Sequence, residues 1–164
     1  MNTSLCYHCF QEKFENAPIC PRCGYCAADD AGKHPLALPC GTVLGGKFII
    51  GHVLGQGGFG ITYIAQDYQT KERVAVKEFF PDAMAMRNQS NMVSAHSGVQ
   101  NENFQYGKAC FLNEAETLAE FIGNPHIIRV YSYFEENGTA YYVMEYIESE
   151  SLQQYAKEHN GRLS

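Results

Sequence analysis

Four cysteines near the start of the chain are spaced as two pairs that could share one metal ion. Cys6 and Cys9 form one C-x-x-C pair, and Cys20 and Cys23 form a second pair after ten intervening residues. Each pair brings two thiolates to one side of a tight turn, and two such turns close a tetrahedral site of four sulfurs. The spacing predicts a structural zinc site, because a closed site of this kind leaves no open position for catalysis.

A disulfide pair or a redox-active C-x-x-C is the alternative for these cysteines. The residues at the start of the chain have neither a basic segment nor an apolar segment of the secretory type, so we expect a reducing compartment. In that setting clustered cysteines bind metal more often than they oxidise. Residues 1–27 are similar to zinc-ribbon modules, and because so small a module cannot fold on an apolar core, we expect the metal to supply its folding energy.

A glycine-rich loop is the second feature with chemical potential. Its G-x-G-x-x-G spacing lets the backbone approach phosphate oxygens, but it occurs in more than one fold. In a dinucleotide-binding fold the loop leads into a helix, with an acidic residue about 20 positions later. Here a strand-like run, residues 61–64, follows instead, and Lys77 ends a short apolar run further on. That order resembles the glycine loop, second strand and third-strand lysine of protein kinases. The loop is Leu54-Gly55-Gln56-Gly57-Gly58-Phe59-Gly60.

Lys77 and Glu114 are the candidate catalytic residues. In the kinase arrangement the lysine offers a fixed positive charge to the α- and β-phosphates of ATP, and a glutamate from a helix pairs with it. A helix is predicted around Phe111, because apolar residues recur there at steps of four and three. Glu114 lies beside this apolar face, where a carboxylate needs a partner. Glu116 is the rival, but it lies about 200° away around the helix.

From about Gly41 to Ser164 the chain is similar to bacterial Ser/Thr protein kinases, on the segments Gly-Gly-Phe-Gly-Ile-Thr-Tyr and Val-Ala-Val-Lys-Glu-Phe-Phe-Pro. The resemblance implies an α+β fold: a kinase small lobe with a five-stranded antiparallel sheet plus one helix (helix C), preceded by the zinc ribbon. The predicted domains are a zinc ribbon at 1–27, a linker at 28–44, and the lobe at 45–164, which extends through the hinge into the first helix of the large lobe.

The resemblance also implies where ATP binds. Residues 141–147 correspond to the fifth strand and the hinge, where the Glu145 carbonyl and the Ile147 N–H face the adenine edge. Met144 corresponds to the gatekeeper, and Thr62 stands where valine is usual. Besides the glycine loop and Lys77, the residues implied to bind the nucleotide are Leu54, Thr62, Ala75, Met144, Glu145 and Ile147.

The chain contains no His-Arg-Asp, Asp-Phe-Gly or Ala-Pro-Glu motif. The catalytic base and the metal-binding aspartate of a kinase are therefore not in it, and most Mg²⁺ ligands would lie in the large lobe. We expect a fragment: the ATP-binding portion of an enzyme that transfers the γ-phosphate of ATP to Ser or Thr of proteins, inactive alone. The alternatives are a non-catalytic zinc-ribbon and pseudokinase module that binds a partner, and a redox or nucleic-acid protein that acts through its cysteines.

Composition narrows the class of protein. The chain has 164 residues, 45% hydrophobic and 18% charged, with a net charge of −6. This is a globular composition, and the negative charge argues against nucleic acid or a membrane surface as a partner, because both attract basic patches. No apolar stretch reaches the roughly 18–20 residues that span a bilayer. We expect a cytoplasmic location, and leave open whether a longer parent carries a membrane anchor downstream.

The predicted elements run strand, strand, strand, helix, strand, strand, helix. Asn124-Pro125 is expected to end the first helix, and Asn137-Gly138 between two strand-like runs is the strongest short hairpin signal. Capping-box spacing from Ser151 predicts the last helix. Residues 81–107 fit no period and are predicted to form a long irregular connection. The predicted strands are residues 48–54, 61–64, 74–76, 127–134 and 139–145.

Overall fold

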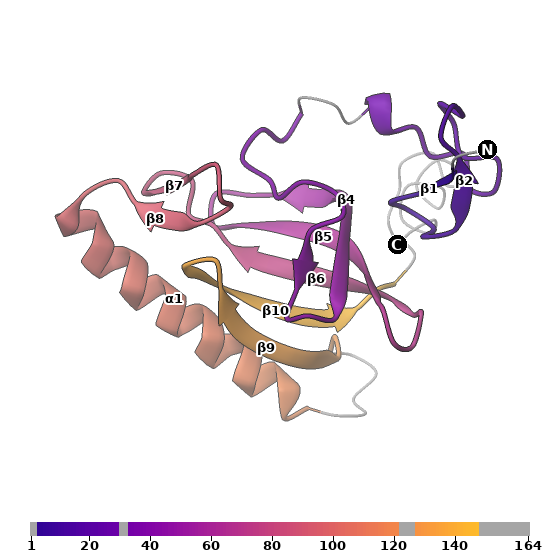
Figure 1. Cartoon of the computed structure of the whole chain (residues 1–164). Coiled ribbons are helices and arrows are strands. Elements are labelled where there is room, and N and C mark those ends of the chain that lie inside the picture. Colours follow the sequence, from indigo (N-terminus) through magenta and orange to yellow (C-terminus); the bar gives the residue numbers. More distant parts are fainter. Residues whose placement is uncertain (1–2, 30–32, 122–126, 148–164) are drawn as a thin grey trace, which may run out of the picture.

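A twisted antiparallel sheet with one long helix packed against it forms the body of the protein (Figure 1). The computed structural model describes residues 3–29, 33–121 and 127–147, to which the structural account is confined. The strand order is β3-β4-β5-β6-β10-β9, and every neighbouring pair is antiparallel. The strands are β3 (Val43–Leu44), β4 (Phe48–Gln56), β5 (Gly60–Asp67), β6 (Arg73–Phe79), β9 (Val130–Glu136) and β10 (Thr139–Glu145).

The predicted α+β class and the five-stranded antiparallel sheet with one helix are confirmed, with the two-residue strand β3 added at one edge. The cysteine-rich segment packs at one end of the sheet, and the small β7–β8 hairpin packs at the other (Figure 1). The remaining elements are β1 (Thr3–Leu5), β2 (Glu12–Phe14), the 3₁₀ turn η1 (Ala27–Asp29), β7 (Ala85–Arg87), β8 (Val93–Ala95) and α1 (Gly98–Ala119).

The two faces of the sheet bury different partners, because side chains alternate along each strand. One face, here called the helix face, carries Lys77, Phe79 and Tyr142 and packs on α1. The Phe79 ring lies 5.6 Å from that of Phe111, which lies 4.9 Å from that of Tyr142. The opposite face, here called the linker face, is covered by residues 33–42 and by the β7–β8 hairpin. Leu38 is buried there, and its backbone N–H donates to the Tyr63 hydroxyl at 2.9 Å.

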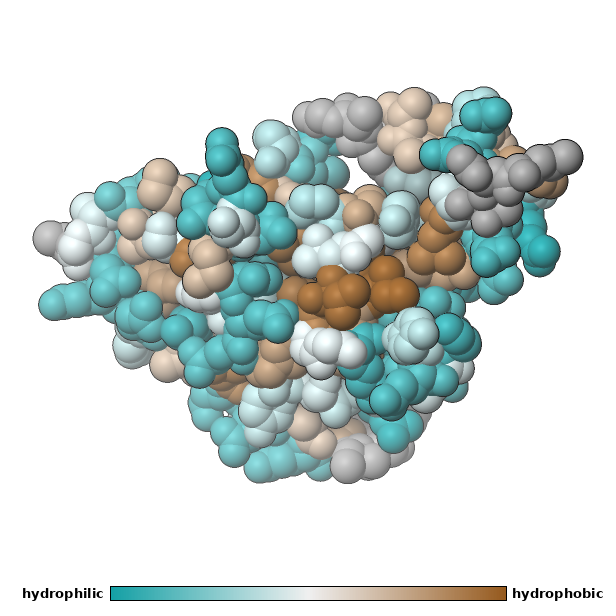
Figure 2. All heavy atoms as spheres, in the orientation of Figure 1, coloured by the Kyte–Doolittle hydropathy of each residue, from teal (hydrophilic) through white to brown (hydrophobic). Residues whose placement is uncertain are grey.

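Apolar surface stays exposed at one edge of the sheet. Figure 2 shows hydrophobic atoms in the middle of this view, over the sheet, with hydrophilic atoms around them. The edge strand β3 leaves Val43 53% exposed. No helix in the described residues is both long and apolar enough to cross a membrane.

The prediction of an irregular connection over residues 81–107 is wrong. Its first part forms the β7–β8 hairpin, and its last part is the first half of α1. Ser97 caps the helix, because its hydroxyl accepts the backbone N–H of Gln100 at 3.3 Å. Among the described side chains of the first ten helical residues, Phe104 alone is buried. With one buried apolar residue in three turns, this part of the sequence has no helical periodicity of apolar residues. Tertiary packing, and not an apolar stripe, therefore stabilises the helix here.

The predicted hairpin turn at Asn137-Gly138 is confirmed. Both residues have positive φ, 54° and 73°, and Glu136 pairs directly with Thr139. Positive φ at both central residues is typical of the type I′ turn, the two-residue hairpin turn that matches the twist of the strands. The Asn137 carbonyl also accepts the Val93 N–H at 2.7 Å, which ties the turn to β8. The predictions for Asn124-Pro125 and for the helix from Ser151 lie outside the described residues.

A buried carboxylate joins the parts that cover the linker face. Glu78 is 0% exposed, and it accepts the hydroxyls of Tyr63 at 2.8 Å and Tyr141 at 2.6 Å. Arg87 of β7 forms an ion pair with the same carboxylate, and its Nε donates to the Leu36 carbonyl at 2.7 Å. Burial alone would lower the pKa of Arg87, but the charge and hydrogen bond of Glu78, with smaller contributions from Tyr63 and Tyr141, together outweigh burial and raise that pKa. One network therefore holds β6, the hairpin and the linker together.

We predict that Glu78→Gln lowers the free energy of unfolding by about 3–5 kcal/mol, because it leaves the buried Arg87 guanidinium without its counter-charge. Chemical denaturation followed by circular dichroism measures this. The matched control is Glu135→Gln, since Glu135 pairs with Lys108 at 2.9 Å but its side chain is 57% exposed. We expect the control to cost less than about 1 kcal/mol. Equal effects of the two substitutions would show that the buried network does not hold the lobe together.

Candidate functional site

Lys77 lies in the centre of the sheet, on the helix face. Its Cα is directly opposite Thr62 on β5 and Tyr142 on β10. Directly opposed residues of antiparallel strands share a face, so the three side chains stand in one row. The Lys77 Nζ lies 5.8 Å from the centroid of the Tyr142 ring.

Two further predicted site residues, Ala75 and Met144, lie in the neighbouring row on the same face, two residues along the strands. Ala75 is the Cα partner of both Ile64 and Met144, so these side chains share the face of Lys77. We call Thr62, Ala75, Lys77 and Met144 the central strip.

The other residues predicted to bind the nucleotide lie at the margins of the central strip. Leu54 falls in a register shift of β4 and is 39% exposed, and Ile147 is 61% exposed. The backbone N–H of Glu145 donates to the Arg129 carbonyl at 2.8 Å. That bond fixes the end of β10 just before Ile147.

The glycine-rich loop turns between β4 and β5 and is attached to the segment after β6. The Gly58 carbonyl accepts the N–H of Asp82 at 3.1 Å, and the Phe59 carbonyl accepts the N–H of Phe80 at 3.0 Å. The Phe59 side chain is 77% exposed at the tip. These bonds hold the loop beside the strand that carries Lys77.

Gly60 marks the closest approach between the loop and the lysine. A Cβ atom at this position would lie 2.7 Å from the Glu78 carbonyl oxygen and 3.6 Å from Lys77 Cε. By contrast, a Cβ on Gly57 would meet nothing within 4 Å. The last glycine of the motif is therefore required by strand packing next to the lysine.

The charges of Glu114 and Lys77 have opposite effects on the pKa of Tyr142. Burial raises this pKa; the charge of Lys77 opposes the rise and the charge of Glu114 adds to it. Among the described ion pairs, none joins Lys77 to Glu114, whose side chain is exposed. Lys77 thus lies near the Tyr142 ring without a direct contact to Glu114.

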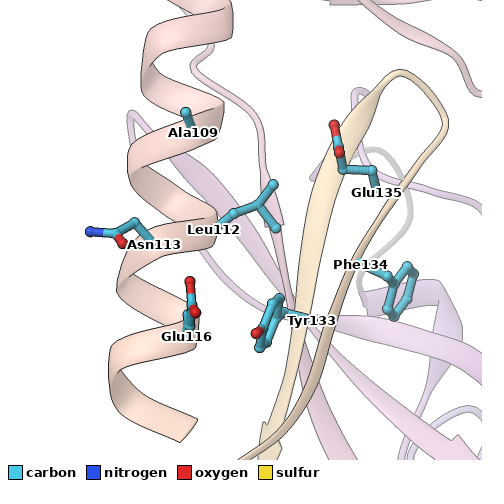
Figure 3. A pocket seen from close by; sticks show the side chains of 7 residues that line it. All are labelled: Ala109, Leu112, Asn113, Glu116, Tyr133, Phe134 and Glu135. Atoms are coloured by element: carbon cyan, nitrogen blue, oxygen red, sulfur yellow. The ribbon is translucent and has the colours of Figure 1, made fainter. Parts of the chain in front are cut away.

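Glu116 faces a different part of the lobe. It lines an open groove of about 520 Å³ between α1 and β9, together with Leu112 and Tyr133. Figure 3 shows Leu112 and Tyr133 directed into the space between helix and strand, with Glu116 beside the tyrosine, whereas Phe134 points away from the helix. Glu116 thus lines the groove between α1 and β9, whereas the charge of Glu114 contributes to the raised pKa of Tyr142, the residue opposite Lys77.

Comparison with known proteins agrees with this arrangement. A family model described as protein kinase domain matches residues 48–164. The chain belongs to the protein kinase family. The lobe is 34% identical to the solved structure of PpkA-294 in its apo form, with a TM-score of 0.68 over 74% of this chain and 43% of that one.

Curated relatives of this kinase lobe include bacterial Ser/Thr kinases. A probable serine/threonine-protein kinase of Clostridium acetobutylicum is 30% identical over 123 residues, which cover 75% of this chain and 16% of the relative. Serine/threonine-protein kinase B of Synechocystis sp. is 30% identical over 120 residues, which cover 72% of this chain and 18% of the relative. The chain thus spans less than a fifth of either relative, and the family match leaves out residues 1–47.

The four predicted cysteine ligands do come together. Their sulfur atoms all lie within 4.8 Å of one another, with Cys6 and Cys23 at 3.6 Å and Cys9 and Cys20 at 3.7 Å. A tetrahedral zinc site with bonds near 2.3 Å separates its sulfurs by roughly 3.8 Å. The cysteines are free thiols. Burial works to raise the pKa of Cys20, but hydrogen bonds from the backbone N–H groups of Arg22 and Cys23, together with those from the Cys6 and Cys23 thiols, outweigh burial and lower that pKa to about 6.

Sequence reasoning missed two residues that organise the site of this kinase lobe. Tyr142 carries the ring on which both predicted catalytic charges act. Glu78 follows Lys77 directly, so it lies on the opposite face and anchors the strand there. A signal for Glu78 was present in the sequence: a carboxylate inside an apolar strand needs a buried partner.

We predict that Gly60→Ala destabilises the lobe by about 1–3 kcal/mol, because the new methyl group overlaps the Glu78 carbonyl and must push β5 and β6 apart. Gly57→Ala is the matched control, and its cost should stay below about 1 kcal/mol, because that position is open and Gly57 has no positive φ. Thermal unfolding of both variants measures the difference. A Gly60→Ala protein as stable as the control would contradict the close packing.

Proposed function

We propose that this chain is the ATP-binding portion of a Ser/Thr protein kinase that transfers the γ-phosphate of ATP to Ser or Thr side chains of proteins. The observation that carries the proposal is the position of Lys77. It belongs to the central strip and lies beside the last glycine of the phosphate-binding motif, where a Cβ on Gly60 would be 3.6 Å from Lys77 Cε. A lysine held beside a glycine-rich loop, with a glutamate on the helix that packs on the same face, suits the phosphates of a nucleotide.

Each predicted residue has a role in this proposal. The backbone of the glycine loop covers the phosphates, and Phe59 shields them from water. Lys77 neutralises the α- and β-phosphates, and Glu114 closes onto Lys77 in the active state. Ala75 and Met144 bound the adenine ring, together with Leu54, Thr62 and the backbone of Glu145 and Ile147. Mg²⁺ supplies charge neutralisation for the transferred group, and its ligands lie mainly in the kinase large lobe.

We further propose that Cys6, Cys9, Cys20 and Cys23 hold one zinc ion in a structural site. The sulfur separations support a tetrahedral ion, and no fifth described residue joins the cluster. Residues 1–27 would then form a zinc ribbon and residues 28–44 the linker, with the lobe from residue 45 onward. We place the activity in the cytoplasm, where ATP is abundant and thiols stay reduced.

A non-catalytic binding module is the second candidate. The observation that favours it is the lack of a direct ion pair between Lys77 and Glu114, both of which are described. Against it stand the intact glycine loop and Lys77, because a pure scaffold needs no phosphate-binding residues. Phosphate transfer by the full-length protein separates the two candidates.

We predict that Lys77→Met in the full-length protein lowers phosphate transfer to a Ser/Thr substrate by about 100-fold or more, because the phosphates lose their fixed counter-charge. Transfer of radiolabelled γ-phosphate measures it, with circular dichroism to show that the fold persists. Lys71→Met is the matched control, because Lys71 is exposed at the turn between β5 and β6 and should leave activity unchanged. Full activity of Lys77→Met would reject the assignment of Lys77.

We predict one zinc per chain in protein purified without chelator, measured by elemental mass spectrometry. Cys20→Ser should lose the metal and loosen residues 3–26, because metal ligation supplies most of the folding energy of so small a module. Cys110→Ser is the control, since Cys110 is exposed on α1 and lies outside the cluster, and it should keep the zinc. Wild-type protein that holds no metal would refute the zinc site.

A further inference from the structure

The cysteine-rich segment, residues 3–26, packs on the helix face of the sheet, which also carries the central strip. We call this segment the ribbon. Phe10 of the ribbon is 4% exposed. A Cβ on Gly51 of β4 would lie 2.9 Å from Phe10 Cζ, 2.8 Å from Ile64 Cγ2 and 2.4 Å from the Tyr7 carbonyl oxygen. Only glycine leaves room at position 51 for the ribbon to approach this closely.

The backbone of β4 is shaped to receive the ribbon. The pairing of β4 with β5 shifts register between Ile50 and Val53. Within this irregularity the backbone N–H of His52 donates to the Tyr7 carbonyl at 3.2 Å. A bulge commonly redirects backbone groups away from the ladder, and here it offers a donor to the ribbon.

Three rings reinforce the contact. The Tyr25 ring stacks on that of His52, with centroids 4.6 Å apart, and the His8 ring stacks on His52 at 5.1 Å. The contact also reaches the hinge end of the sheet. Arg73, the first residue of β6, donates to the His8 carbonyl at 3.4 Å, and its guanidinium lies 5.2 Å from the ring centre of Tyr146.

Apart from Tyr25, the ribbon residues that make this contact lie in or directly after the first cysteine pair. Tyr7 and His8 are the two residues between Cys6 and Cys9, and Phe10 follows directly. We call Cys6–Phe10 the first hook. Its shape is unusual, because Phe10 has φ 58° and donates its N–H to the Cys6 carbonyl at 2.8 Å. The turn that presents two thiolates to a metal therefore also presents the groups that dock on β4.

The docking point adjoins the adenine end of the central strip. Ile64, which Phe10 approaches around Gly51, is the Cα partner of Ala75, and Ala75 is the partner of Met144. Antiparallel partners share a face, so Ile64, Ala75 and Met144 follow one another across the helix face. Phe10 lies at the Ile64 end of this row, because both side chains border the space above Gly51. The ribbon packs against one end of this face, and α1 packs against the other end through the contact of Phe111 with Phe79.

We propose that metal loading of the ribbon controls nucleotide affinity: a thiophilic divalent ion such as Zn²⁺ fixes the first hook, and the hook holds the adenine end of the strip in its binding shape. This inference rests on the proposed nucleotide and zinc sites. Phe10 acts as a positioning residue through Ile64 and does not touch the nucleotide. Binding at one site then shifts affinity at the other by a reciprocal coupling.

The test compares Phe10→Ala with Phe14→Ala in the full-length, zinc-loaded protein. Phe14 is the matched control, because it belongs to the same ribbon but its side chain is 58% exposed. Binding of a fluorescent ATP analogue should weaken about tenfold in Phe10→Ala, in the range typical of coupled sites, and should stay unchanged in Phe14→Ala. Zinc content, measured in parallel, should remain one per chain in both variants. Removing zinc from the wild type with a chelator should reproduce the affinity of Phe10→Ala.

Hydrogen exchange provides a readout that does not depend on nucleotide. The His52 amide should exchange faster in Phe10→Ala and after chelation, because its acceptor on Tyr7 moves away, and should keep its wild-type rate in Phe14→Ala. Zinc-loaded Phe10→Ala that matches Phe14→Ala in affinity and exchange would overturn this inference alone. Wild-type protein that binds no nucleotide would overturn the proposed function and the inference with it. Wild-type protein that holds no zinc would overturn the proposal that metal loading controls nucleotide affinity.

Discussion

The register of β5, β6 and β10 is the constraint on which the rest of the structure depends. Because neighbouring residues of a strand face opposite sides, this register sends Lys77 to one face of the sheet and Glu78 to the other. A slip by one residue would bury the lysine beneath the linker and turn the glutamate toward α1. The buried contacts of Glu78 with Tyr63 and Tyr141 make that slip costly, because each would lose a charge-assisted hydrogen bond. The buried carboxylate of Glu78 thereby fixes the position of the Lys77 amine on the helix face.

The two faces of the sheet make different contacts. On the linker face, Arg87 joins Glu78 to the β7–β8 hairpin and, through the Leu36 carbonyl, to the linker. On the helix face, packing is concentrated at the two ends, where Phe111 meets Phe79 and where Phe10 of the ribbon meets the neighbourhood of Gly51. The central strip lies between these two packed regions. A nucleotide site placed there is bounded by elements that come from distant parts of the chain.

Short-range geometry was predictable from the sequence, and long-range packing was not. The two cysteine pairs, the glycine loop with Lys77 and the Asn137-Gly138 turn are local patterns: the structure brings the four sulfurs together, sets Gly60 beside Lys77 and forms the turn. The binding roles of the cysteines and of Lys77 stay predictions. The first half of α1 escaped prediction because Phe104 is the only described buried side chain in it. The docking of Phe10 and the partners of Glu78 depend on which distant segments meet, which a single sequence does not state.

A nucleotide site at Lys77 can be tested by affinity labelling with an acyl-phosphate derivative of ATP, which transfers its acyl group to an amine beside the bound phosphates. Peptide mass spectrometry then locates the acylated lysine. We expect Lys77 to be labelled in preference to exposed lysines such as Lys71, and excess Mg-ATP to suppress labelling at Lys77 alone. Labelling spread over exposed lysines and insensitive to Mg-ATP would contradict a nucleotide site at the central strip.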